Sequence, residues 1–242
     1  MILNRDKGRL PLLLPILLLS VLLTGCTSIG DYRDPRDPLE SFNRTVYKFN
    51  DGLDEMVIKP LSKGYKAVVP VPVDTGITNF FGNLSDVGSA VNNLLQFKLQ
   101  RAATDAGRVM VNTTLGMLGF IDVASNMNLE KYGEDFGQTL GSWGFGSGLY
   151  IVLPVLGPSS GRDAIGRVFD WYLDPVTYVE SDTARNGLRI LKAVDQRADL
   201  LGASRVMDAA ALDPYEFVRD AYLQKRNSDV YDGNPPLDLY QE

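Results

Sequence analysis

The sequence predicts an all-α protein, and three observations carry this prediction. Apolar residues recur at intervals of three and four along several segments, which is the spacing of one face of a helix. Pro or Gly separates these segments, so the helices are expected to be many and short. A run with the character of a strand occurs only near residues 149–156, and no internal repeat is present.

The first 25 residues have the layout of a secretory signal peptide. Basic residues precede an apolar run from Leu10 to Leu23, which ends in the sequence Leu-Thr-Gly-Cys at residues 23–26. Cys26 is the single cysteine of the chain, and a thiol is the nucleophile that can accept a diacylglycerol. We therefore expect cleavage before Cys26 and lipidation of Cys26, rather than a chance cysteine at an ordinary cleavage site.

The anchor is expected to be acyl chains and not a spanning helix. The apolar run has fourteen residues and contains Pro11 and Pro15, whereas a spanning helix needs about 20 residues. Two or more acyl chains hold a protein stably on a membrane. In lipoproteins of Gram-negative bacteria an Asp directly after the cysteine usually signals inner-membrane retention. Thr27 stands there instead, so we expect the outer membrane, with residues 26–36 as a lipidated, polar tether.

Composition excludes several classes of function. Without residues 1–25, the chain has 217 residues, with 21 Lys plus Arg against 29 Asp plus Glu, a formal charge of −8. This charge argues against binding to nucleic acid, which needs a basic surface. The chain has no histidine, which excludes histidine-based catalysis and zinc sites built on Cys and His. No metal and no cofactor are expected.

The first predicted helix runs from Pro38 to Leu53. Asp37 is the expected N-cap and Glu40 completes a capping box. Apolar residues at spacings of three and four then form a stripe, which with the adjacent Asn43 comprises Leu39, Phe42, Asn43, Val46, Phe49 and Leu53. Two interpretations stay open from the pattern: a surface helix packed on a soluble core, or a helix lying in the plane of the membrane.

Further helices are expected in the central part of the chain. Residues 57–81 hold two short segments divided at residues 70–72, and Asp74 is a plausible cap for the second. Residues 85–97 and 99–113 show helical spacing, and Gly107 interrupts the second of them. A glycine inside a helix costs about 1 kcal/mol, unless another backbone packs closely against it.

A glycine-rich stretch follows at residues 133–148, and an apolar stretch comes after it. From residue 137 to 160 the chain is nearly uncharged, and an exposed apolar surface of this kind usually marks a contact site. Two interpretations stay open: a buried core hairpin, or a mobile hairpin or helix pair that faces lipid. In the second interpretation five glycines act as hinges: Gly137, Gly141, Gly144, Gly146 and Gly148.

The C-terminal third is predicted to contain three helices and a tail. A helix begins at residue 161 and breaks at Asp174-Pro175, a second runs from Asp182 to about Leu201, and a third follows the cap at Asp213 and ends near Arg226. The third helix is expected to turn Phe217, Ala221 and Tyr222 inward. Residues 227–242 contain four acidic residues and no basic one, so disorder is expected there, with docking of a partner as the alternative.

One motif suggests catalysis and is set aside. Residues 157–161 match the G-x-S-x-G pattern of a nucleophile elbow. The serine of such a site needs a histidine to take its proton, and the chain has none. A turn that leads into a helix is therefore the expected role of Ser159 and its neighbours, and no enzymatic activity is expected.

Several segments together resemble the MlaA family, which is also called VacJ. The matching pieces are spread over residues 37–175, and the lipobox lies upstream of them. At residues 148–149 the sequence has Gly-Leu where the family pattern has Gly-Pro. The pieces are Asp37-Pro-Leu-Glu-Ser-Phe-Asn-Arg44 with Phe49-Asn50, Asn112-Thr-Thr-Leu-Gly116 with Gly119 and Asp122, Glu134-Asp-Phe-Gly-Gln-Thr-Leu-Gly141, and Val152-Leu-Pro154 with Gly157-Pro-Ser159 and Arg162-Asp163.

The resemblance implies a ring or disc of short amphipathic helices around a central channel, over residues 37–226, held in the inner leaflet of the outer membrane on its periplasmic side. It further implies a trimeric outer-membrane porin as neighbour, phospholipids as substrate and a soluble periplasmic lipid carrier as acceptor. It favours membrane contact for the stripe at residues 39–53 and a gating role for the glycine-rich hairpin. A structural envelope lipoprotein that stabilises a porin complex without moving lipid is the alternative.

Overall fold

A computed structural model describes residues 34–236 of the chain, and the elements in this range are almost all helical. The predicted signal peptide, Cys26 and most of the predicted tether lie outside the described residues. The elements are α2 (Glu40–Leu53), a π-helical turn (Asp54–Ile58), α3 (Lys59–Val68), α4 (Val71–Leu95), α5 (Leu99–Thr114), α6 (Val123–Asn126), α7 (Phe136–Ser142), β1 (Tyr150–Leu153), β2 (Gly157–Ser160), α8 (Gly161–Leu173), a 3-10 turn (Pro175–Tyr178), α9 (Asp182–Asp199), α10 (Leu201–Ala210) and α11 (Pro214–Val230).

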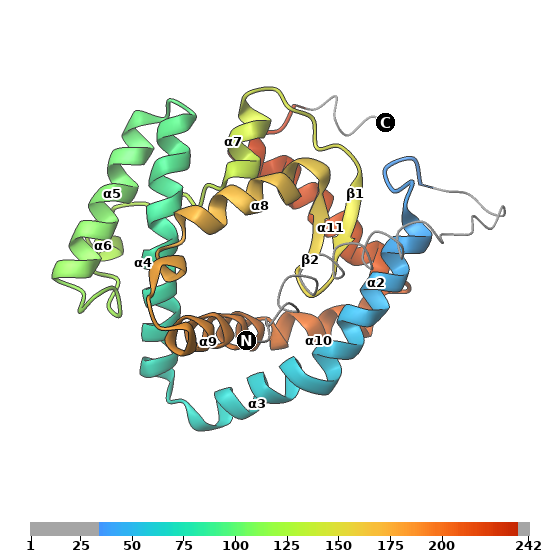
Figure 1. Cartoon of the computed structure of the whole chain (residues 1–242), viewed down its shortest axis with the longest axis horizontal. Coiled ribbons are helices and arrows are strands. Elements are labelled where there is room, and N and C mark those ends of the chain that lie inside the picture. Colours follow the sequence, from blue (N-terminus) through green and yellow to red (C-terminus); the bar gives the residue numbers. More distant parts are fainter. Residues whose placement is uncertain (1–33, 237–242) are drawn as a thin grey trace, which may run out of the picture.

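The helices form a ring. In the view down the shortest axis, α4, α8, the β-hairpin, α10 and α9 enclose a central region, and α5 and α6 lie on the far side of α4 (Figure 1). The same circuit follows from contacts of α4 with α8 and α9, of α8 and α11 with β2, and of α9 with α10. The predicted all-α ring with one hairpin is therefore confirmed.

The hairpin is small and supports the N-terminal helix. β1 and β2 pair antiparallel, with Tyr150 opposite Ser160 and Leu153 opposite Gly157. Tyr150 and Val152 are buried against Tyr215 of α11, and Val46 of α2 packs against this cluster. The tip, at Val155 and Leu156, is exposed.

The predicted start of the first helix is wrong. The helix begins at Glu40 with Leu39 as N-cap and no side-chain capping bond. The carboxylate of Asp37 is fully buried and accepts hydrogen bonds from the side chains of Asn43 and Tyr215. The Asp37 carboxylate therefore binds side chains of the folded protein and does not cap the first turn of α2, as the local sequence predicts.

The first helix also runs further than predicted. It continues through the π-helical turn into α3, so that an almost unbroken helical segment reaches Val68. The break at residues 70–72 is confirmed, with Pro72 in the first turn of α4. The predicted cap, Asp74, lies inside α4 and pairs with Lys66 at 2.7 Å. Since α4 is one helix of 25 residues, the predicted interruption near residue 82 is absent.

In the C-terminal third, the helix that starts at residue 161 and the cap at Asp213 are confirmed, and three details differ. The expected inward face of α11 is wrong for Phe217 and Ala221, which are exposed, whereas Tyr222 is half-buried. A separate helix, α10, occupies residues that no pattern assigned, and α11 ends at Val230, four residues beyond the predicted end. Order extends past the helix because Asp232 pairs with Lys98 and Arg101, each at 2.5 Å. The prediction of disorder from residue 227 is therefore wrong for its first part, and residues 237–242 lie outside the described residues.

Candidate functional site: a polar interior inside an apolar perimeter

Burial in this molecule is inverted with respect to a water-soluble protein. Among the described residues, the fully buried set contains seven hydrophobic side chains and twenty polar or charged ones. Many large apolar side chains are instead exposed, for example Val68 of α3 with 81% of its surface exposed, and Phe97, in the turn between α4 and α5, with 85%. Soluble monomers rarely expose so much contiguous apolar surface. The perimeter is therefore suited to contact with lipid or with other protein.

No described helix is both long enough and apolar enough to cross a bilayer.

The predicted stripe on α2 divides between two environments. Phe49 is 57% exposed and Leu39 is 37% exposed, whereas Phe42, Val46 and Leu53 are half-buried. Val46 packs against the hairpin. Membrane contact therefore stays a prediction for the exposed Leu39 and Phe49, whereas Val46, in the central part of the stripe, supports the hairpin.

Asn43 is the clearest correction in the stripe. It is fully buried, and its side-chain amide acts as a clamp on β1. Its Nδ2 donates to the Tyr150 carbonyl at 3.1 Å and to Asp37 at 2.8 Å, and its Oδ1 accepts from the Val152 N–H at 2.8 Å. The amide thus makes the hydrogen bonds that a neighbouring strand would make to the free edge of β1. Because it is buried, it does not face a membrane.

A charged seam joins α4 to α5. Arg108 of α5 is buried and donates to Asp86 of α4 at 3.1 Å, to Asp122 at 3.0 Å and to the Leu129 carbonyl at 2.6 Å. One turn away, Asp105 accepts from Ser89 at 2.5 Å and from Asn93 at 2.9 Å. Burial, with the nearby charge of Asp86, raises the pKa of Asp105.

A second charged seam joins α7, α8 and α11. Arg226 of α11 donates to both oxygens of Asp135, at 2.6 and 3.0 Å, and to both oxygens of Asp163, each at 2.9 Å. Burial alone would raise the pKa of Asp163, but the hydrogen bonds from Arg226 and Tyr222 outweigh it and lower the pKa to about 2. These interactions fix the C-terminal helix to the hairpin side of the ring.

Asp170 lies beside this seam without a cation of its own. It accepts from the Phe136 N–H at 2.9 Å and more weakly from Asn92 at 3.3 Å. Burial, reinforced by the nearby charge of Asp135, raises its pKa to about 6.

The five predicted hinge glycines also divide into two groups. Gly137 and Gly141 lie within α7, where a Cβ atom would meet Asp163 and Arg226, or Val230 and Arg162, at 2.5 to 2.9 Å. They permit close packing, so the prediction that they are hinges is wrong. Gly144, Gly146 and Gly148 lie in the exposed loop between α7 and β1. Gly144 and Gly148 have φ angles of +92° and +69°, which other residues adopt with difficulty.

The serine of the G-x-S-x-G pattern is inaccessible. Ser159 is fully buried within β2, and the next serine, Ser160, caps α8 by accepting from the Asp163 N–H at 3.1 Å. The expected entry into a helix is thus confirmed, whereas the residues expected to form a turn form strand β2.

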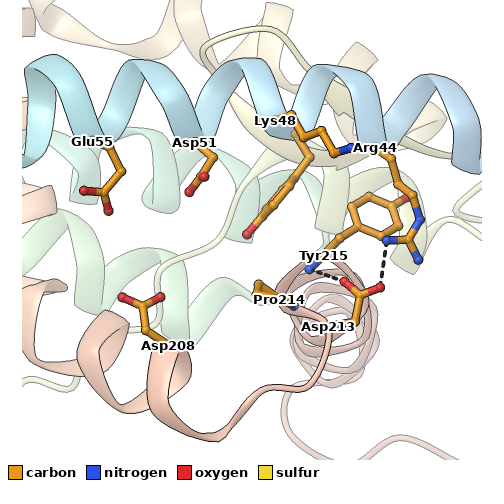
Figure 2. Close-up of a pocket in the computed structure, with 9 residues that line it drawn as sticks. Arg44, Lys48, Asp51, Glu55, Asp208, Asp213, Pro214 and Tyr215 are labelled. Atoms are coloured by element: carbon orange, nitrogen blue, oxygen red, sulfur yellow. Dashed lines mark hydrogen bonds and ion pairs between the residues drawn. The ribbon is translucent and has the colours of Figure 1, made fainter.

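A pocket of about 350 Å³ lies between α2 and the start of α11. Figure 2 shows Asp51 of α2 and Glu55 of the following π-helical turn near Asp208 of α10 at one end, and Lys48 and Arg44 at the other. Tyr47 and Tyr215 also line it, with ring centroids 5.6 Å apart in an edge-to-face arrangement.

The family model for "MlaA lipoprotein" matches residues 35–229. The chain belongs to this family. The Escherichia coli (strain K12) "Intermembrane phospholipid transport system lipoprotein MlaA" is 36% identical over 213 residues, which cover 86% of this chain and 84% of that protein. The Haemophilus influenzae protein of the same name is 34% identical over 237 residues, which cover 91% of each chain.

A solved structure has the same fold. It was reported as "Structural basis for maintenance of bacterial outer membrane lipid asymmetry" and superposes with a TM-score of 0.71 at 35% identity, over 82% of this chain and 100% of that one. This structure and the MlaA relatives confirm the family resemblance that the sequence indicates.

The polar seams are not predicted by the apolar periodicity, although the sequence contains a signal for them. In α4, polar residues at helical spacing form a second face, namely Asn83, Asp86, Ser89 and Asn93. The apolar residues Val87, Val91 and Leu94 have a similar spacing, and a pattern based on apolar residues predicts that their face is the buried one. Arg226 was assigned only to the end of its helix, because its partners Asp135 and Asp163 are distant in sequence.

We expect Asn43→Ala to destabilise the fold strongly. The change leaves the buried Val152 N–H and Tyr150 carbonyl without these partners, and an unsatisfied buried group costs about 1–3 kcal/mol. Denaturant unfolding of the detergent-solubilised protein should show a loss of about 2–3 kcal/mol. Ser41→Ala, at an exposed position of the same helix, is the matched control. Equal stability of the two variants would contradict the clamp.

We expect Asp170→Asn to remove a pH dependence of stability. The raised pKa means that folded Asp170 binds a proton more tightly than the unfolded chain does, whose pKa is about 3.9. Its ionisation therefore destabilises the native state as pH rises from about 4 through 6. The melting temperature of the wild type, relative to the Asn variant, should fall over this range and level off above pH 7. A constant difference would refute this assignment; Glu180→Gln, at an exposed position, should keep the wild-type profile.

Proposed function

We propose that this chain is a lipoprotein of the outer membrane that removes misplaced phospholipids from the outer leaflet and passes them to a soluble periplasmic carrier. The inverted burial carries the proposal. A phospholipid has a charged headgroup and apolar chains, and a body whose exposed apolar side chains can contact acyl chains, while its polar groups pair with one another inside, can lie among such lipids. The names of the E. coli and H. influenzae relatives support the same assignment.

The proposed position is within one leaflet, with the apolar perimeter against acyl chains. Burying a large apolar side chain in an apolar environment contributes about 1.5–3 kcal/mol, and exposed examples occur on α3, α5, α8 and α9. Lipidation of Cys26 would hold the body at the membrane, and the seams would keep the ring closed. The central region would then serve as the channel.

The proposed partners follow from this position. A trimeric porin would occupy part of the apolar perimeter, and a periplasmic lipid carrier would meet the ring where lipid leaves it. The second candidate is an envelope lipoprotein that stabilises the porin without moving lipid. The exposed apolar surface suits both candidates, so transfer of lipid decides between them.

The proposed gate is the loop at residues 143–149, which carries the remaining glycines. Every residue of this loop is exposed, including Trp143, Phe145 and Leu149. Aromatic residues of this kind are favoured where a membrane meets water. The loop connects α7 with β1, so its movement could open a path beside the hairpin while both seams stay intact.

The function is tested by lipid transfer. Full-length lipidated protein in vesicles with labelled phospholipid should deliver the label to a soluble lipid-binding acceptor. Leu99→Glu with Met110→Glu places two charges on exposed apolar positions of α5, and a charge in lipid costs about 2.5–3.5 kcal/mol. The double variant should therefore lose most membrane insertion and transfer.

The matched control places the same charges at Gln100 and Thr114, which are exposed polar positions of the same helix. This control should transfer lipid at the wild-type rate. Wild-type protein that binds the vesicles but delivers no label would refute transport and leave the structural role.

For the gate, we expect Gly144→Val to slow transfer several-fold while the protein folds normally. A β-branched residue at a φ of +92° is strained, so the loop must rearrange, although the site has open space for the side chain. Gly146→Val is the control, because Gly146 has open space and no positive φ. Equal transfer rates for both variants would argue that the loop is not the gate.

A further inference from the structure

In the pocket of Figure 2, positive side chains gather at one end and negative ones at the other, whereas the arginines of the seams contact carboxylates directly. Its lining contains two cations, Arg44 and Lys48, and four carboxylates, Asp51, Glu55, Asp208 and Asp213, so that its formal charge is −2. In the seams, each cation has a carboxylate partner at close distance. The pocket instead keeps charged groups without protein partners.

Lys48 and Asp51 are the two unpaired groups. Within the described part of the chain, neither side chain makes a hydrogen bond or an ion pair. Arg44, by contrast, is bound to Glu40, Asp213 and Glu216 and lies over the ring of Tyr215 at 4.4 Å. The free cation thus lies at the Arg44 end and the free carboxylate lies at the Glu55 and Asp208 end (Figure 2).

The acidic end has excess negative charge. Lys59 pairs with Glu55, and it lies 4.0 Å from Asp208, so one lysine serves two carboxylates and Asp51 has none. The negative charge also acts on Tyr47. Its pKa is raised first by burial and then by the charges of Asp51, Asp208 and Asp213. An aromatic ring beside carboxylates is a favourable environment for an ammonium group.

The chemistry of the lining restricts the ligand. Charged groups and tyrosines exclude acyl chains, and the volume of about 350 Å³ is at the small end of ligand sites, which span about 300–1,000 Å³. Among the residues that the structure describes, no acidic group is arranged to hold a metal ion. An organic ligand with a primary ammonium and a separate anionic group matches both ends.

We propose that this pocket binds the phosphoethanolamine headgroup of a phospholipid, with the ammonium at Asp51, Glu55 and Asp208 and the phosphate at Lys48. The inference rests on the proposed function and adds a headgroup preference to it. A primary ammonium donates three hydrogen bonds, which carboxylates accept. An anionic headgroup such as phosphoglycerol adds negative charge to an already negative pocket and is disfavoured.

The test measures which lipid the protein retains. Full-length protein is equilibrated in detergent with a 1:1 mixture of phosphatidylethanolamine and phosphatidylglycerol with identical acyl chains, purified again and analysed by mass spectrometry. We expect retained lipid from the wild type to be enriched several-fold in phosphatidylethanolamine. Asp51→Asn with Asp208→Asn should abolish the enrichment while the total amount of lipid stays similar.

Two controls separate charge from fold. Glu180→Gln with Asp182→Asn removes two exposed carboxylates elsewhere and should keep the enrichment. Lys48→Met should instead lower the total amount of retained lipid, because the phosphate that both lipids carry loses its cation, and Lys63→Met, at another exposed lysine, should not.

The outcomes distinguish this inference from the proposed function. Wild-type protein that retains no phospholipid contradicts the proposed function. Retained lipid of the same composition in wild type and in the Asp51 and Asp208 double variant overturns the headgroup site and leaves the function. A titration with soluble glycerophosphoethanolamine should show weak binding that the double variant loses. Tight binding of this soluble compound, with no effect on retained lipid, would assign the pocket to a free metabolite and overturn the proposal.

Discussion

The fold depends on arginine–carboxylate pairing in its interior. Arg108 and Arg226 each reach two carboxylates on other elements, and most of the buried side chains among the described residues are polar or charged. A guanidinium suits this role because its planar donors match carboxylate geometry. Removing one partner of such a pair is costly, since the remaining charge stays buried. The Arg226 seam therefore holds α7, α8 and α11 together within the ring, and the Arg108 seam holds α5 and α6 against α4.

This arrangement is the one that a lipid surrounding favours. In lipid, apolar side chains gain nothing by leaving the surface, so the hydrophobic effect does not bring helices together, and polar contacts and close packing take over. Both are present here. The polar contacts are the seams, and the close packing occurs where α7 crosses α8. There a Cβ atom on Gly166 would lie 2.5 Å from the backbone nitrogen of Gly137, so glycine is required for the approach that brings Asp135 and Asp163 to one arginine.

The sequence predicts helices in this protein better than it predicts which face of each helix is inside. Helical periodicity located α5, α8, α9 and α11, because the spacing of residues reports the helix itself. The direction of burial depends on the surroundings: a rule that places apolar residues inside assumes water outside. Asn43 shows the consequence, because it lies beside an apolar stripe and is nevertheless the buried group that holds β1. The long-range partners of Arg226 could not be read from spacing, since 63 and 91 residues separate them from it.

The polar interior and the pocket also differ in a way that bears on function. The arginines of the seams are paired with carboxylates, whereas the side chains of Lys48 and Asp51 have no partner among the described residues. Both residues are on α2, the helix whose Asn43 holds the hairpin and whose Arg44 reaches Asp213 at the start of α11. A headgroup bound at Lys48 and Asp51 would therefore contact the same helix that holds β1 through Asn43.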